Sequence, residues 1–210
     1  MTPQRKVWTV LAVLYAVFFY WYTPFGGPLT SAEIEQYVEQ LERPDSDPDR
    51  IAVWRRFMES DTGGDFAMAN YIRLRETPTL VEGVAEGDTS QDVLRRYTEP
   101  FMREAFLDAA HPVFLGRAAN DALDLWGIEN ADTWSIAGLV RYRSRRDVMN
   151  QALKVRAAGT HRFKLAAMEQ TIAFPVDPWF HMGDPRLLLA FLFLVVGLAL
   201  NLRTAKKQAA

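Results

Sequence analysis

The residues best suited to chemistry in this 210-residue chain are one amide, several arginines, one tryptophan and one histidine. Asn70 interrupts the apolar face of a segment in which apolar residues recur at every second position. A buried amide without a partner costs about 1–3 kcal/mol, so we expect Asn70 to bond to backbone, water or ligand. The guanidinium groups of Arg73, Arg75 and Arg141 suit carboxylates and can gather around an anion, or can lie on a solvated or dimer-facing surface. The candidate pocket residues are Asn70, Arg73, Trp134, Arg141 and His161.

The three histidines do not have the spacing of a local metal site. His111, His161 and His181 are separated by 50 and 20 residues, whereas ligands on one helix are usually four apart. We therefore predict no metal site. His161 can serve as a general base or heme ligand, or it can be an ordinary residue on a helix surface.

Other catalytic motifs are missing from the sequence. With no Cys, the chain has no thiolate nucleophile, Cys-ligated zinc or iron–sulfur cluster. It also has no nucleophile elbow, phosphate-binding glycine loop or dinucleotide fingerprint. The run 63–66 (GGDF) lacks the final Glu of the diguanylate cyclase signature. The sequence therefore identifies no catalytic residue and no cofactor.

The charges are balanced in total but unevenly placed. Lys and Arg number 24 and Asp and Glu 26, for a formal net charge of −2, which argues against general nucleic-acid binding. All 26 acidic residues lie within residues 33–184. Residues 26–185 hold only 18 Lys and Arg against them, a formal net charge of −8. The other six basic residues lie in the two ends, which have no acidic residue.

Two uncharged apolar runs border these basic ends. Residues 7–25 number 19 and would span about 28 Å as a helix, close to the ~30 Å of a bilayer's hydrocarbon core. Residues 187–202 number 16 and reach about 24 Å, which snorkelling by Arg186 and Arg203 can extend. We predict an uncleaved N-terminal anchor and a C-terminal transmembrane helix, with Trp179 and His181 at the interface. The alternatives are a cleaved secretory signal for the first run and a buried helix for the second.

The basic residues also predict the topology. Positive residues are retained on the cytoplasmic side of a membrane, so Arg5 and Lys6 at one end and Arg203 and Lys206 at the other predict cytoplasmic termini. The expected location is therefore the inner (cytoplasmic) membrane, with the acidic central domain outside the cytoplasm, which means the periplasm in a bacterium.

Residues 30–64 have the pattern of two short amphipathic helices. Thr30 and Glu33 have the spacing of a capping box, and Pro44 ends the first helix. Asp47 and Pro48 suit the cap and first position of the second helix.

From Phe66 onward the chain predicts alternating strands and helices. The apolar period changes to two at Phe66, and further strands are expected at residues 113–118, 134–142 and 171–176. Helices are expected at 93–107, kinked or divided by Pro100, and at 144–168, interrupted at Gly159. This order is that of a ferredoxin-like βαββαβ domain, here α+β and set between an N-terminal and a C-terminal transmembrane helix. The expected divisions are the anchor 1–25, the helical pair 26–64, the ferredoxin-like domain 65–178, and the C-terminal helix with its basic tail 179–210.

Short motifs in this region resemble the dimeric α/β-barrel superfamily. They are NYIRLR at 70–75, LVRY at 139–142, Ser144-Arg145, His161-Arg162, Ala166 and Thr171. They are most similar to a branch of unknown function related to EthD-like proteins and antibiotic-biosynthesis monooxygenases. Arg143 replaces a Pro common in that branch, and the transmembrane anchors are additions to it. The resemblance implies a homodimer of two sheets packed face to face, each with a pocket between sheet and helices.

Two functions from different classes remain open. The first is a membrane-anchored protein whose extracytoplasmic ferredoxin-like domain dimerises and binds a partner or a small apolar ligand. The second is an enzyme, an oxygenase-type or heme-dependent protein acting on a lipophilic small molecule, with the five candidate residues in its pocket. The sequence does not decide whether the protein is an enzyme.

Overall fold

The computed structural model describes residues 2–44, 46–178 and 182–209, and the chain divides into two compact units. One unit is Gly26–Pro178, which holds the sheet. The other consists of Met1–Phe25 and Trp179–Ala210. Trp179 and His181, expected at a membrane interface, lie outside the described residues.

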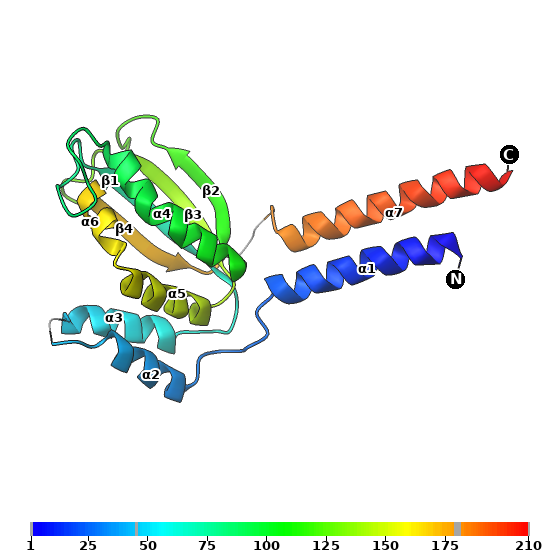
Figure 1. Ribbon diagram of the computed structural model, residues 1–210, viewed down its shortest axis with the longest axis horizontal. Coiled ribbons are helices and arrows are strands. Elements are labelled where there is room, and N and C mark those ends of the chain that lie inside the picture. The colour runs from blue at the N-terminus through cyan, green and yellow to red at the C-terminus, as the bar shows by residue number, and fades with distance from the viewer. Residues whose placement is uncertain (1, 45, 179–181, 210) are drawn as a thin grey trace. The chain divides into compact units, whose positions relative to one another are not determined.

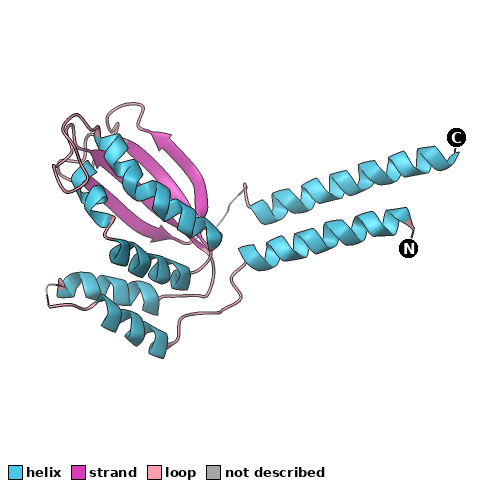
Figure 2. Ribbon diagram, in the orientation of Figure 1, coloured by secondary structure: helices cyan, strands magenta, loops and turns pink. Residues whose placement is uncertain are grey.

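The sheet has four antiparallel strands (Figure 2), so the predicted α+β class is confirmed. Its strands are β1 (Phe66–Leu74), β2 (His111–Arg117), β3 (Ile136–Tyr142) and β4 (Met168–Val176). In space their order is β2-β3-β1-β4, with β1 in the interior between β3 and β4. All four expected strands are present, and the fourth begins at Met168, three residues before the predicted start at Thr171.

Five helices belong to the same unit as the sheet (Figure 1). They are α2 (Ser31–Leu41), α3 (Pro48–Glu59), α4 (Ser90–Leu107), α5 (Arg145–Ala158) and α6 (His161–Ala167). The predicted capping box is confirmed, since the Thr30 hydroxyl accepts from the Glu33 amide and Glu33 accepts from the Thr30 amide. Gly159, at φ 66°, ends α5 as predicted, whereas α4 continues through Pro100.

One side of the sheet, called the helix side here, packs against α4, α5 and α6. Phe66 and Met68 of β1 pack with Ala105 of α4 and Val148 of α5, and Ile72 packs with Val93 of α4 in a second cluster. Burial of these side chains is the main stabilising contribution of the domain. The helices therefore cover the side chains of Phe66, Met68 and Ile72 on this side of the sheet.

The helical pair α2 and α3 is part of the same packed unit. Met149 of α5 is fully buried in a cluster with Ile34 and Val38 of α2 and Met58 of α3. Arg146 of α5 bonds to Glu33 at 2.8 Å, and these bonds lower the pKa of Glu33 to about 2. The pair is thus held to α5 by apolar contacts and by charge.

The second unit is a pair of helices, α1 (Pro3–Tyr22) and α7 (Pro185–Ala209), that lie side by side in opposite directions (Figure 1). The Tyr15 hydroxyl donates to the Arg186 carbonyl at 3.2 Å, and farther along Trp8 lies over Gly197. A Cβ added at Gly197 would lie 2.7 Å from Trp8 Cζ3, so only glycine allows this close approach. The N-terminal end of α1 and the C-terminal end of α7 therefore lie at the same end of the pair.

Among the described residues, one helix is long and apolar enough to cross a membrane. It is Pro185–Thr204, with a mean hydropathy of 2.2 and 6% of its span buried. The predicted C-terminal segment is thus long and apolar enough to cross a membrane. The helix at the predicted N-terminal segment, α1, is not. The physical reason is composition: α1 includes Arg5 and Lys6, and the polar groups of Tyr20, Trp21 and Tyr22 lower its hydropathy further.

Candidate functional site

Asn70 lies on the helix side of β1, between the two apolar clusters. Its side-chain amide donates to the Met68 carbonyl at 2.9 Å. Its neighbours across the sheet are Gly138 of β3 and Ala173 of β4, both small. Backbone thus supplies the partner that we expected for this amide.

Trp134 lies just before β3 and contacts the opposite side of the sheet. Its ring meets that of Tyr71 edge-on, with ring centres 6.1 Å apart. Its indole N–H donates to the Ala131 carbonyl at 2.9 Å. Tyr71 alternates with Asn70 along β1, so Trp134 and Asn70 are on different sides of the sheet.

The two candidate arginines lie at opposite ends of the sheet. Arg73 is near the end of β1, where its Nε is 3.1 Å from a Glu169 carboxylate oxygen. Arg141 is opposite Ala67, near the start of β1, and is 4% exposed. It donates to Asp65 at 2.9 Å and to the Ala109 carbonyl at 3.0 Å. The structure therefore does not bring Arg141 to the other two arginines.

Arg73 and Arg75 do line one depression of about 610 Å³, together with Glu76 and Glu169. The Arg75 Nε is buried there without a hydrogen-bond partner. Two carboxylates already balance the two guanidinium groups, however. The depression is therefore a polar surface with no net charge to attract an anion.

The side of the sheet that faces away from α4, α5 and α6 exposes a group of large apolar residues. We call it the open sheet face and define it by Tyr71, Phe114, Ile172 and Phe174. These side chains are 41%, 54%, 38% and 44% exposed. Tyr71 and Phe174 stack with ring centres 6.5 Å apart. A group of exposed apolar side chains on one face is typical of a site that another molecule covers.

His161 is the first residue of α6 and belongs to a group that the sequence interpretation did not identify. Its ring meets Tyr97 of α4 edge-on at 6.1 Å, and the Lys164 ammonium lies 5.8 Å from the centre of the same Tyr97 ring. The positive charge of Arg50 of α3 adds to the electrostatic surroundings of both.

The surroundings alter the acid–base behaviour of this group. Burial, followed by repulsion from Lys164 and Arg50, lowers the pKa of His161. Burial and then Arg50 lower the pKa of Lys164, and burial raises the pKa of Tyr97. The sequence signal was the separation of His161 and Lys164 by three positions on one helix, which places both on the same face.

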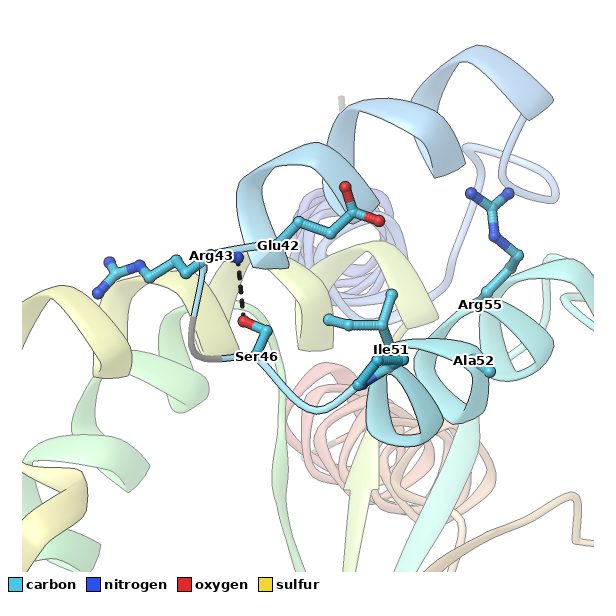
Figure 3. A pocket seen from close by; sticks show the side chains of 7 residues that line it. Glu42, Arg43, Ser46, Ile51, Ala52 and Arg55 are labelled. Carbon is cyan, nitrogen blue, oxygen red and sulfur yellow. Dashed lines mark hydrogen bonds between the residues drawn. The ribbon is translucent and has the colours of Figure 1, made fainter.

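The groove between α2 and α3 contains no reactive side chain (Figure 3). It has a volume of about 620 Å³, and the Ile51 side chain lies in its middle, between the guanidinium groups of Arg43 and Arg55. Arg55 is held by both carboxylate oxygens of Glu35, and the Ser46 hydroxyl is bonded to the Arg43 amide and the Leu41 carbonyl. This groove is therefore a gap between capped helices.

No group of three or more His, Asp or Glu side chains in the described parts of the chain is arranged to hold a metal ion. His111 lies on the edge strand β2, where its Nδ1 is 3.1 Å from the Pro112 carbonyl. The five predicted pocket residues are divided between the two sides of the sheet and its two ends.

Comparisons with known proteins identify a similar fold. No family model matches the chain, and no curated protein matches it. A crystal structure of the methylated RPA0582 protein is similar, with a TM-score of 0.50 and 20% sequence identity; the match covers 69% of this chain and 99% of that chain. A second crystal structure, of the RPA0582 protein of unknown function from Rhodopseudomonas palustris, has a TM-score of 0.49 and 20% identity over 65% and 97% of the two chains. At this identity the likeness is one of fold alone.

Proposed function

We propose that this protein is a membrane-anchored binding protein whose ferredoxin-like domain, related to the dimeric α/β barrels, lies outside the cytoplasm and forms a homodimer. The open sheet face is the observation that carries the proposal. The order of elements from β1 to β4 is strand, helix, strand, strand, helices, strand, with β1 and β3 in the centre of the sheet. Within the unit Gly26–Pro178, the helices α4, α5 and α6 pack on one side of the sheet, so the other side can receive a second copy.

A second copy suits the open sheet face for a reason of chemistry. Tyr71 and Phe174 present stacked rings without a charged group between them, so the same surface on another chain would be complementary to it. Aromatic side chains of this kind supply most of the binding energy in known interfaces. A small apolar ligand or a partner protein would then bind elsewhere on the dimer.

Membrane anchoring is supported by the pair of helices α1 and α7. The apolar α7 would cross the bilayer, and α1 would lie against it as the second anchor, since the two are antiparallel and pack closely at Gly197. Basic residues lie toward the ends of both helices that come together, which favours cytoplasmic termini. With both copies anchored in one membrane, the two-fold axis of the dimer would run along the membrane normal.

Replacing Tyr71 with Asp is expected to convert the dimer into a monomer. A charge in an apolar interface stays unpaired, and loss of an aromatic contact of this kind costs about 2 kcal/mol or more, so the dissociation constant should rise at least about 30-fold. Light scattering of the full chain in detergent measures this. Val53→Asp is the matched control, because Val53 is 55% exposed on α3, away from the open sheet face. A wild-type protein that is monomeric at all concentrations would contradict the dimer.

The membrane topology can be tested with single cysteines, because the chain has none of its own. We expect a membrane-impermeant maleimide to label Leu123→Cys in intact cells, since Leu123 is 94% exposed in the loop between β2 and β3. Thr2→Cys and Gln208→Cys should be labelled only after the membrane is permeabilised. Labelling of either terminal cysteine in intact cells would contradict the proposed orientation.

A further inference from the structure

The connection between β2 and β3, residues 118–135, contains no helix or strand. We call it the β2–β3 loop; it joins two neighbouring strands of the sheet (Figure 1). Adjacent antiparallel strands need a turn of only about 2–5 residues, and loops of more than about 12–15 residues without secondary structure are uncommon in compact domains unless they have a function. The length of this loop is therefore more than the joining of β2 to β3 requires.

The base of the β2–β3 loop is fixed to the sheet by backbone hydrogen bonds. The Ala118 amide donates to the Ser135 carbonyl at 3.1 Å, and the Ala122 amide donates to the Asp132 carbonyl at 2.7 Å. Residues 123–130, called the loop tip here, lie beyond these bonds, and all of them are exposed. The fold thus presents the loop tip to solvent from a fixed base.

The loop tip exposes large apolar side chains. Leu123 and Trp126 are 94% and 92% exposed, the highest values among the large apolar residues that the structure describes. Leu125 and Ile128, in the same segment, are exposed as well. Single exposed apolar residues are common on protein surfaces, whereas several in one short segment indicate an interaction site. Trp is also among the residue types most enriched where a few side chains dominate binding.

Charge determines which kind of surface this segment can bind. Residues 118–135 contain four acidic residues and no Lys or Arg, a formal net charge of −4. A second copy of the chain is a poor match, because residues 26–185 have a net charge of −8 themselves. A membrane surface is a poor match too, because its anionic headgroups repel carboxylates. A protein surface with basic residues around an apolar groove would attract both the carboxylates and the apolar side chains.

We propose that the loop tip binds a partner protein at an apolar groove bordered by Lys or Arg residues. Trp126 and Leu123 would enter the groove, and the carboxylates of Asp121, Asp124 and Glu129 would pair with the basic residues at its border. The fixed base of the loop reduces the conformational freedom that is lost on binding. This inference rests on the partner-binding half of the proposed function and names the class of partner; it does not depend on the dimer.

Photo-crosslinking in cells that naturally express the protein tests which molecule the loop tip contacts. The probe is p-benzoylphenylalanine in place of Trp126 in the full chain. The same probe in place of Leu80, which is exposed outside the loop, is the control. We expect irradiation to join position 126, but not position 80, to one protein. The crosslinked peptide of that protein should contain Lys or Arg beside apolar residues.

Binding of the captured protein, once purified, to the full chain in detergent tests the chemistry of the contact. Trp126→Ala should raise the Kd at least about 30-fold, the effect of losing an aromatic side chain that dominates an interface. Asp121→Asn, Asp124→Asn and Glu129→Gln together should raise the Kd about tenfold at low salt and abolish its increase with NaCl. Leu80→Ala should change the Kd less than about twofold, and circular dichroism checks that all variants remain folded.

Other outcomes would overturn the proposal. Crosslinks from position 126 only to lipid would assign the loop tip to the membrane surface, and crosslinks only to another copy of the chain would assign it to self-association. No crosslink at position 126 beyond that at position 80, or a captured protein that binds Trp126→Ala as tightly as the wild type, would also refute it. Light scattering of the same samples tests the dimer separately, so a monomer that still binds the captured protein would refute only the dimer.

Discussion

Replacing Asp61 with Ala is expected to lower the free energy of unfolding of the domain Gly26–Pro178 by about 3–5 kcal/mol. The side chains of Asp61 and Arg145 are 3% and 6% exposed and approach to 3.7 Å. Asp61 also accepts hydrogen bonds from the backbone amides of Leu29 and Gly63, both at 2.9 Å. Without Asp61 the Arg145 charge would remain buried and uncompensated. Urea denaturation of the full chain in detergent, followed by tryptophan fluorescence, measures the change.

An exposed ion pair on the same helical pair serves as the control. Glu35 and Arg55 form a two-bond contact, but their side chains are 64% and 34% exposed. Because solvent screens such pairs, Glu35→Ala should change the free energy of unfolding far less than Asp61→Ala does. A double variant, Asp61→Leu with Arg145→Met, should be less destabilised than Asp61→Ala, since no buried charge is left. Equal losses for Asp61→Ala and Glu35→Ala would refute this explanation.

The reason for the large effect is the position of this pair in the chain. Asp61 is in the connection between α3 and β1, and Arg145 is the first residue of α5. Arg145 also donates to the Phe57 carbonyl and to the Ser60 hydroxyl, and it lies over the Phe57 ring at 4.9 Å. One guanidinium thus joins the end of α3 to the start of α5.

The secondary structure was predictable because its signals are local. The Thr30 and Ser144 caps each depend on a residue three positions away, and both caps are present. The alternation that begins at Phe66 determined the faces of β1, since strand side chains point to opposite sides in turn. Gly159 ended α5 because its backbone takes a left-handed conformation that glycine adopts without strain.

The candidate site was less predictable because its contacts join distant parts of the chain. Arg141 is held by Asp65, 76 positions earlier, and nothing in the local sequence indicates that partner. His161 meets Tyr97 only because α6 packs on α4, which neither helix's own periodicity reveals. Short-range reasoning placed Asn70 and Arg73 on opposite faces of β1 correctly, but it did not show which residues from other elements would join them.

Replacing Phe66 with Ala is expected to lower the free energy of unfolding by about 3–5 kcal/mol, because the loss leaves a cavity that its neighbours cannot fill. Phe66 is 1% exposed, stacks on Tyr142 of β3 at 5.7 Å and meets Phe57 of α3 edge-on at 5.5 Å. It is therefore the side chain through which the sheet and the helical pair share a core.

The effect of the lost side-chain volume can be separated from the effect of the lost aromatic contacts. Phe66→Leu keeps most of the volume but no aromatic contact, so it should cost clearly less than Phe66→Ala if cavity formation dominates. Leu80→Ala, at a residue 60% exposed, should change the unfolding free energy by less than about 0.5 kcal/mol. If instead Phe66→Leu were as destabilised as Phe66→Ala, the ring contacts with Phe57 and Tyr142 would matter more than the filled volume, and the coupling of α3 to the sheet would be an aromatic one.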